Sequence, residues 1–210
     1  MIRGRPLALA RLAFGLLTIV AIVAQYTHRE NPSAFYTTNF LSFFTNESNL
    51  LAAGLLSYGA YRGLRWGAQE SSSAYELLRG AAVIYMTITG VVFVLLLSGS
   101  SESVPWANAV VHYVMPVVIV LDWLIVPPRM RVTWRKALRW LIFPVVYFGY
   151  TLIRGAITGW YPYPFLNVAA KGYGQVLADG AGILIGMIAV GSATLLAGNR
   201  LRERRVAPTS

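Results

Sequence analysis

The chain contains no cysteine and only two histidines, His28 and His112. The absence of cysteine excludes disulfide bonds, thiolate nucleophiles, iron–sulfur clusters and cysteine-based zinc sites. A zinc hydrolase site needs three protein ligands, which are typically histidines. Two histidines cannot supply them, so a metal site would have to be built from carboxylates. We therefore expect no metal ion and no cofactor.

Several motifs that mark enzymes are also missing. The chain lacks the H-E-x-x-H metalloprotease motif, the phosphate-binding loop and the glycine fingerprint of dinucleotide-binding proteins. It also lacks the G-x-S-x-G elbow that carries the nucleophile of α/β-hydrolases. These absences leave a hydroxyl nucleophile with a histidine base as the catalytic chemistry to be sought in this sequence.

Charged residues are scarce, at 12% of the chain against roughly a quarter in soluble proteins. Hydrophobic residues make up 56%, and the mean hydropathy is +0.55. The 210 residues leave room for about six spans of roughly 20 residues each. The composition therefore predicts an all-α, polytopic membrane protein. We expect a six-helix transmembrane bundle over residues 1–198 as a single domain, followed by a basic, disordered tail over residues 199–210.

The apolar runs place the six predicted spans at residues 7–26, 37–61, 74–97, 106–126, 137–152 and 175–197. The fourth ends at Pro127 and Pro128, which lack the N–H donor that would continue a helix. A cleaved signal peptide would also explain the first run, but the further spans favour a retained anchor.

The net charge of +10 follows the predicted topology. Of the 18 basic residues, three lie on one predicted side, Arg29, Arg154 and Lys171, and the other 15 (18 − 3) lie on the side of the two termini. Because cytoplasmic loops carry the excess of arginine and lysine, we expect both termini to be cytoplasmic. The positive charge then sets the orientation of the chain in the membrane and contacts anionic lipid headgroups. We expect no nucleic-acid partner.

A run of five polar residues, Thr45-Asn46-Glu47-Ser48-Asn49, interrupts the second predicted span. Polar groups are costly in hydrocarbon unless partners satisfy them, so they face a bundle interior or a cavity. At a rise of about 1.5 Å per residue, Thr45, His112 and Asp179 fall near one level in the outer leaflet. Arg154 closes the fifth span at that level. Several helices are therefore predicted to meet in one pocket.

Each of these residues also has a plainer interpretation. Thr45 and Ser48 could bond the carbonyl one turn back, as membrane hydroxyls often do. Asn49 could join neighbouring helices. Glu47 could be a neutral structural carboxyl, and Asp179 could form an ion pair with Arg154.

The functional interpretation makes Thr45 a nucleophile and His112 its base. Asn49 would donate to the oxyanion, with Ser48 in support. Glu47 or Asp179 would orient the imidazole. A stiff aromatic segment over residues 160–165 is typical of an interfacial belt or a pocket lid. We assign its side chains to the substrate pocket together with Arg154: Trp160, Tyr161, Tyr163 and Phe165.

Three segments carry a resemblance to a known family: residues 44–51 (FTNESNLL), residues 112–116 (HYVMP) followed by Asp122, and residues 161–166 (YPYPFL). Together they resemble the bacterial Pr-six-Pr membrane proteins. More distantly, they resemble the androgen-induced membrane threonine hydrolases that cleave fatty acid esters of hydroxy fatty acids. The resemblance implies a bacterial inner (plasma) membrane location, a lipid or other amphiphilic substrate, Thr45 as nucleophile and His112 as the histidine of the site.

Two functions fit these features of the sequence. One is a membrane hydrolase that cleaves a lipid acyl ester. The other is a non-enzymatic binding or proton- or ion-coupled transport module that uses Glu47, Asp179 and His112. A structural subunit whose polar core only specifies helix packing is a third interpretation.

Overall fold

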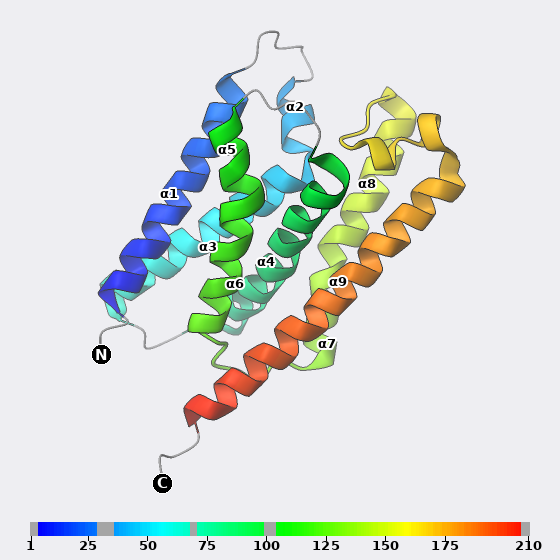
Figure 1. The fold of residues 1–210 in the computed structure, drawn as a ribbon. Coiled ribbons are helices and arrows are strands. Elements are labelled where there is room, and N and C mark those ends of the chain that lie inside the picture. Colours follow the sequence, from blue (N-terminus) through cyan, green and yellow to red (C-terminus); the bar gives the residue numbers. More distant parts are fainter. Residues whose placement is uncertain (1–3, 29–35, 68–70, 99–103, 207–210) are drawn as a thin grey trace.

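A computed structural model describes residues 4–28, 36–67, 71–98 and 104–206, with the side chain of residue 206 excepted. Every regular element in these ranges is a helix, which confirms the all-α prediction (Figure 1). Long helices run side by side as a bundle, and shorter turns join them.

The helices are α1 (Arg5–Thr27), α2 (Tyr36–Leu41), α3 (Phe44–Trp66), α4 (Ser73–Val92), α5 (Pro105–Ala109), α6 (Met115–Ile125), α7 (Trp134–Ala137), α8 (Ile142–Thr158) and α9 (Val168–Val206). Two π-helical stretches, η1 (Phe93–Leu97) and η2 (Val110–Val114), continue α4 and join α5 to α6. Two 3₁₀ stretches are η3 (Leu138–Leu141), which joins α7 to α8, and η4 (Pro164–Leu166).

Five helical stretches are long and apolar enough to cross a membrane: Arg5–Thr27, Ser73–Leu97, Pro105–Ile125, Trp134–Thr158 and Val168–Arg205. They correspond to five of the six predicted spans, and they make the chain an integral membrane protein. Helix α3 is not among the five. Its 23 residues include the polar run, Arg62 and Arg65, and 11 of them are buried inside the fold.

Local sequence signals explain several helix ends. Ser72 caps α4 by accepting a hydrogen bond from the Tyr75 N–H at 3.2 Å. Pro105 begins α5, where its missing N–H costs nothing. Gly159, with φ of 70°, ends α8 in the left-handed conformation that glycine adopts without strain.

The predicted second span differs from the structure at its start. Helix α2 stops at Leu41, Phe43 is extended with φ −79° and ψ 125°, and α3 begins at Phe44. The Ser42 hydroxyl donates back to the Thr38 carbonyl at 2.6 Å and so belongs to the end of α2. The polar run therefore forms the first turns of α3, and Ser42 lies outside that helix.

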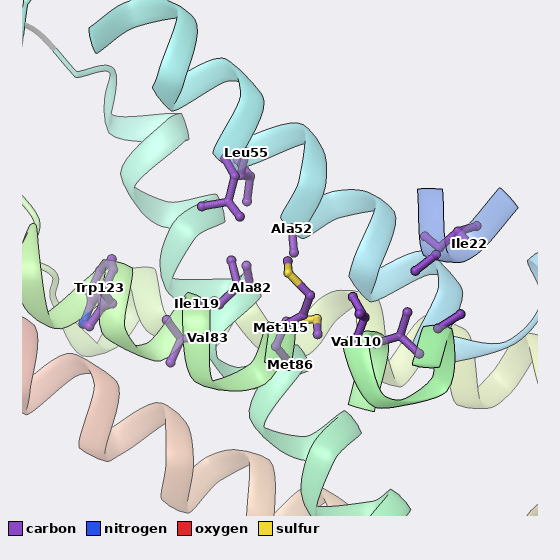
Figure 2. Close-up of a cluster of buried hydrophobic side chains, with 14 of the residues drawn as sticks. Ile22, Ala52, Leu55, Ala82, Val83, Met86, Val110, Met115, Ile119 and Trp123 are labelled. Atoms are coloured by element: carbon purple, nitrogen blue, oxygen red, sulfur yellow. The ribbon is translucent and has the colours of Figure 1, made fainter. Parts of the chain in front are cut away.

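Helix α4 is the centre of the bundle. In its apolar window 56% of the residues are buried, against 22% to 39% in the other four candidate spans. One face packs into a core with α1, α3 and α6, where Ala82, Val83 and Met86 meet side chains such as Met115 and Ile119 (Figure 2). The other face packs with α8 and α9 in a second core. The chain thus forms two cores that share α4.

Helix α9 extends into the predicted basic tail. Helix α9 bends at Gly172, where φ is 75°, and it continues to Val206, so residues 199–206 are helical. The Asn199 side chain accepts a hydrogen bond from the Val132 N–H at 3.0 Å and donates to the Val132 carbonyl at 2.8 Å. Arg202 donates to the Arg129 carbonyl at 2.8 Å. These contacts hold the last turns of α9 against the segment before α7.

The start of α1 and the end of α9 lie at the same end of the bundle (Figure 1). At that end, buried charges join three helices. Asp122 of α6 accepts from Arg11 of α1 at 2.6 Å and from Arg79 of α4 at 2.8 Å. Arg79 also pairs with Glu76 at 3.1 Å. Asp122 is thus shared by two arginines from different helices.

We expect Asp122→Asn to destabilise the fold, because it leaves two largely buried guanidinium groups without their shared carboxylate. Breaking a buried pair in this way costs about 3–5 kcal/mol. A thermal melt of the detergent-solubilised protein measures the loss. The matched control is Asp179→Asn, whose pair with Lys171 is exposed. Equal melting temperatures for the two variants would show that the buried cluster does not hold α1, α4 and α6 together.

Candidate functional site

The site is built around the beginning of α3. The first N–H groups of any α-helix have no acceptor within the helix. Here the Phe44 N–H donates to the Tyr147 hydroxyl and the Thr45 N–H donates to the Tyr163 hydroxyl, both at 3.2 Å. Tyr147 in turn donates to the Ser42 carbonyl at 2.9 Å. Two phenols, from α8 and from the segment that follows it, therefore satisfy the helix start and set the position of Thr45.

The Thr45 hydroxyl lies between two side chains from other parts of the chain. Its Oγ1 is 3.4 Å from His112 Nε2 and 3.3 Å from the Tyr163 hydroxyl oxygen. These distances lie at the long end of the hydrogen-bond range, as is common at catalytic sites without substrate. The structure thus brings together the hydroxyl and the imidazole that the depth argument predicts to meet.

Thr45 behaves differently from several other hydroxyls in the helices. The following side chains donate to the carbonyl four residues back, at 2.7–2.9 Å: Thr18, Thr151, Ser192 and Thr194. That is the plainer interpretation offered for hydroxyls of this kind. Because Thr45 stands in the first turn of α3, its hydroxyl is directed to His112 and Tyr163 instead.

His112 sits in the π-helical stretch η2. Pro116 has no N–H to donate to the His112 carbonyl, so the ordinary α-helical hydrogen bond cannot form there. The Met115 N–H accordingly bonds to the Val110 carbonyl five residues back. Such bulges are frequent at functional sites because they redirect a side chain.

Two contacts fix the imidazole. Its Nδ1 lies 2.5 Å from Asn108 Oδ1 and 3.2 Å from the Asn108 carbonyl oxygen. Both oxygens are acceptors, so Nδ1 carries the proton and Nε2 presents its lone pair to Thr45. The Phe93 ring stacks on the imidazole at 3.9 Å between centroids and 17° between planes. The imidazole is therefore held in the tautomer that a base facing Thr45 requires.

Asn49 does not have the role that its position suggests. Its side-chain nitrogen donates to the Thr45 carbonyl at 2.9 Å and to the Val111 carbonyl at 3.2 Å. These bonds tie α3 to η2 and use both N–H groups of the amide. Asn49 is thus the helix-joining residue of the plainer interpretation, and it has no donor left for an oxyanion. Ser48 lies beside it, fully buried.

Neither of the two carboxylates predicted to orient His112 is hydrogen-bonded to it. Asp179 accepts from Lys171 at 3.2 Å and from Gln175 at 2.7 Å, both in its own helix. Glu47 has one buried carboxylate oxygen without a hydrogen-bond partner in the described part of the chain. Asn108 orients the imidazole in their place. Its spacing of four residues before His112 is the sequence signal for this contact, since such residues are neighbours on a helix.

The aromatic segment after α8 folds over the start of α3. The Trp160 ring meets Phe43 edge to face at 5.7 Å, and the Arg154 guanidinium lies 4.5 Å from the centre of the same ring. Arg154 also donates to the Asn39 side chain at 2.5 Å. Arg154 therefore anchors this segment to α2 and makes no ion pair with Asp179.

The inner part of the segment is buried against α8. The Tyr161 ring covers Gly155, where any larger residue would overlap it. The Tyr163 and Phe165 rings stack at 5.1 Å between centroids. Burial raises the pKa of Tyr163 above the ordinary value of a phenol, so its hydroxyl keeps its proton. The predicted pocket wall thus includes a proton donor within reach of Thr45.

A cavity of about 260 Å³ begins at Thr45 and extends between α4, α8 and α9. Its polar side chains, Thr45, Thr89, Tyr147 and Tyr163, are few beside the apolar ones, which include Ile88, Val92, Phe148, Leu184 and Met187. Cavities with a few polar groups on one side of an apolar wall are typical of sites for small amphiphilic ligands.

No group of three or more histidine, aspartate or glutamate side chains placed to hold a metal ion occurs in the described ranges. Comparisons of the chain with protein-family models, with curated proteins and with solved structures find no match.

The tautomer of His112 can be measured directly. We expect nitrogen NMR of histidine-labelled protein to show the proton of His112 on Nδ1, and Asn108→Leu to lower the population of that tautomer because the closer acceptor is lost. His28, exposed at the end of α1, is the internal control and should not change between the two proteins. Finding the His112 proton on Nε2 in the unaltered protein would contradict the arrangement described above.

Proposed function

We propose that the chain is an integral membrane hydrolase that cleaves a lipid acyl ester, with Thr45 as nucleophile and His112 as general base. The observation that carries the proposal is the relay of three side chains, Thr45 Oγ1 to His112 Nε2 and His112 Nδ1 to Asn108 Oδ1. Hydroxyl, imidazole and an orienting acceptor in this order form the arrangement that activates nucleophiles on unrelated folds.

In the first half of the reaction, His112 Nε2 takes the Thr45 hydroxyl proton as Oγ1 attacks the ester carbonyl carbon. The tetrahedral intermediate collapses by breaking the bond to the alcohol oxygen. The departing alkoxide takes the proton from His112 Nε2 and leaves as the alcohol, while the acyl group stays on Thr45 as an ester. Asn108 keeps the imidazole oriented throughout, because its side-chain oxygen accepts the hydrogen bond from the Nδ1–H group.

In the second half, water replaces the alcohol. His112 Nε2 removes a proton from the water molecule as its oxygen attacks the acyl-Thr45 carbonyl. Collapse of this intermediate returns the proton to Thr45 Oγ1 and releases the fatty acid. One water molecule is consumed and one ester bond is cleaved, so the enzyme returns to its starting state.

The oxyanion formed in both halves needs a donor. The Tyr163 hydroxyl is 3.3 Å from Thr45 Oγ1 and retains its proton, so it supplies that donor. The positive end of the α3 dipole lies at the same point and favours negative charge there. Tyr163 therefore takes the role expected of Asn49.

The cavity supports an acyl substrate. Its polar end is at Thr45 and its walls between α4, α8 and α9 are apolar, so an acyl chain would lie in the cavity with its ester carbonyl at Thr45. The resemblance to membrane threonine hydrolases suggests esters of hydroxy fatty acids as one such class. We also infer that α3 crosses the membrane, which brings the number of spans to six, and that both termini are cytoplasmic. The resemblance to the Pr-six-Pr proteins suggests a bacterial plasma membrane. Thr45 then lies in the outer half of the bilayer.

One observation favours a second candidate, a proton-binding module for transport. Glu47 is close to the site, and its buried carboxylate oxygen has no partner among the described residues. A buried carboxyl of that kind can take up and release a proton. Against a shared site for Glu47, Asp179 and His112, Asp179 is occupied by Lys171 and Gln175 on α9.

Labelling with a fluorophosphonate probe tests the hydrolase and distinguishes it from the transport module. We expect purified protein to be labelled, Thr45→Ala to be unlabelled, and His112→Ala to be labelled about 10²–10⁴-fold more slowly, since that is the usual contribution of a general base. The matched control is Thr89→Ala, because Thr89 is the other threonine in the wall of the same cavity and has no hydrogen bond to His112.

Equal labelling of the unaltered protein and Thr45→Ala would overturn the nucleophile assignment. A binding or transport module predicts no labelling of any of these proteins, which makes the two candidate functions separable in a single gel.

A further inference from the structure

A second cavity lies where α1 begins, α3 ends and α4 begins. This end of the bundle is opposite the start of α3 (Figure 1). The volume of the cavity is about 90 Å³. That is room for several water molecules, since each needs about 10–15 Å³ of such space. Four arginines line it: Arg11, Arg62, Arg79 and Arg129. Neither of the proposed functions uses this cavity.

Positive charge exceeds negative charge in the cavity. Arg11 and Arg79 are held by Asp122 and Glu76, which leaves two cations and two anions balanced. Arg62 has no carboxylate within ion-pair distance in the described part of the chain. Its guanidinium lies 5.8 Å from the centre of the Tyr58 ring and 5.9 Å from that of Tyr75. The charge of Arg62 therefore exceeds those that the buried carboxylates balance.

Neutral donors accompany this charge. Ser71 lines the cavity, and its buried hydroxyl has no partner among the described residues. The first turn of α1 also contributes to the wall through Gly4, Leu7 and Ala8. Gly4 has no side chain that could cap that turn, so the N–H groups of the turn add to the positive potential. Guanidinium, hydroxyl and helix-start N–H groups together are the donors that bind phosphate oxygens in proteins.

The surface beside the cavity indicates the level of the lipid headgroups. The last turns of α3 carry three exposed aromatic side chains, Tyr58, Tyr61 and Trp66. Tyrosine and tryptophan concentrate where a span leaves the hydrocarbon. Arg62 and Arg65 lie among them on the same helix. The cavity therefore opens at the depth where phosphate groups of lipids are found.

The geometry points to a binding site for an anionic phosphate group, most simply that of an anionic phospholipid headgroup, with Arg62 as the residue that contacts it. Arg11 and Arg79 form the floor, where Asp122 and Glu76 hold them in place. Arg62 has no carboxylate partner among the described residues, so it can give two parallel N–H donors to the phosphate oxygens. Bound lipid would then join the start of α1 to the end of α3.

The test uses native mass spectrometry of the full chain in detergent, with dioctanoyl phosphatidylglycerol as probe and dioctanoyl phosphatidylcholine as its zwitterionic control. We expect saturable binding of the anionic lipid and weaker binding of the control. Arg62→Gln should weaken binding of the anionic lipid at least about tenfold, which is the effect of losing one charge-assisted hydrogen bond. The matched control is Arg65→Gln, which removes the same charge three residues away on the same helix but outside the cavity.

Arg62→Lys keeps the charge and provides a second variant, with binding expected between that of the unaltered protein and that of Arg62→Gln. If sodium phosphate displaces the lipid from the unaltered protein but has no effect on Arg62→Gln, the site takes free phosphate as well as headgroups, and the assignment of Arg62 stands. Equal losses for Arg62→Gln and Arg65→Gln, or binding that does not saturate, would overturn the site and indicate attraction to the basic surface as a whole.

Discussion

The hydrogen bonds from Phe44 and Thr45 to two tyrosine hydroxyls are the contacts on which the rest of the site depends. A helix that begins inside a bundle must find acceptors for its first N–H groups, because no water is available there. Tyr147 and Tyr163 provide them from α8 and from the segment after it. The same bonds place the Thr45 hydroxyl, turn it away from its own helix and put the aromatic segment over it. The hydrogen bonds that stabilise the start of α3 therefore also position the proposed nucleophile.

Buried polar groups have different kinds of partner at the two ends of the bundle. Near Thr45 the partners are neutral: phenols, amides, an imidazole and backbone carbonyls. At the other end they are ions, with Asp122 shared by Arg11 and Arg79. Helix α4 lies between the two cores and touches both, which explains why it is the most buried of the candidate spans. The neutral groups at the first end form only long hydrogen bonds with the Thr45 hydroxyl. The ion pairs at the second end hold α1, α4 and α6 together.

Much of the arrangement could be predicted from the sequence because membrane spans have strong signals. Apolar runs of about 20 residues located all five candidate spans, whereas the polar run predicted to lie inside the second span forms the first turns of α3. The break at Ser42 and Phe43 could not be seen, because its cause is a pair of tyrosines more than 100 residues further along the chain. The orienting group could not be identified from the sequence for a related reason. A charged residue in a membrane segment is the stronger functional signal, yet the amide of Asn108, one turn from His112, makes the contact, while Asp179 is satisfied on its own helix. The helical tail follows from Asn199, whose partner Val132 has no recognisable sequence signal.

The central claim is that Thr45 becomes acylated during turnover. Intact and peptide mass spectrometry of the protein, quenched in acid while it turns over a long-chain ester, measures this directly. The account predicts a single acyl group on the peptide that contains Thr45, which accumulates in the presence of ester and disappears once the ester is consumed. Ester hydrolysis by purified protein with no adduct at Thr45, or with the acyl group on another side chain, would contradict it.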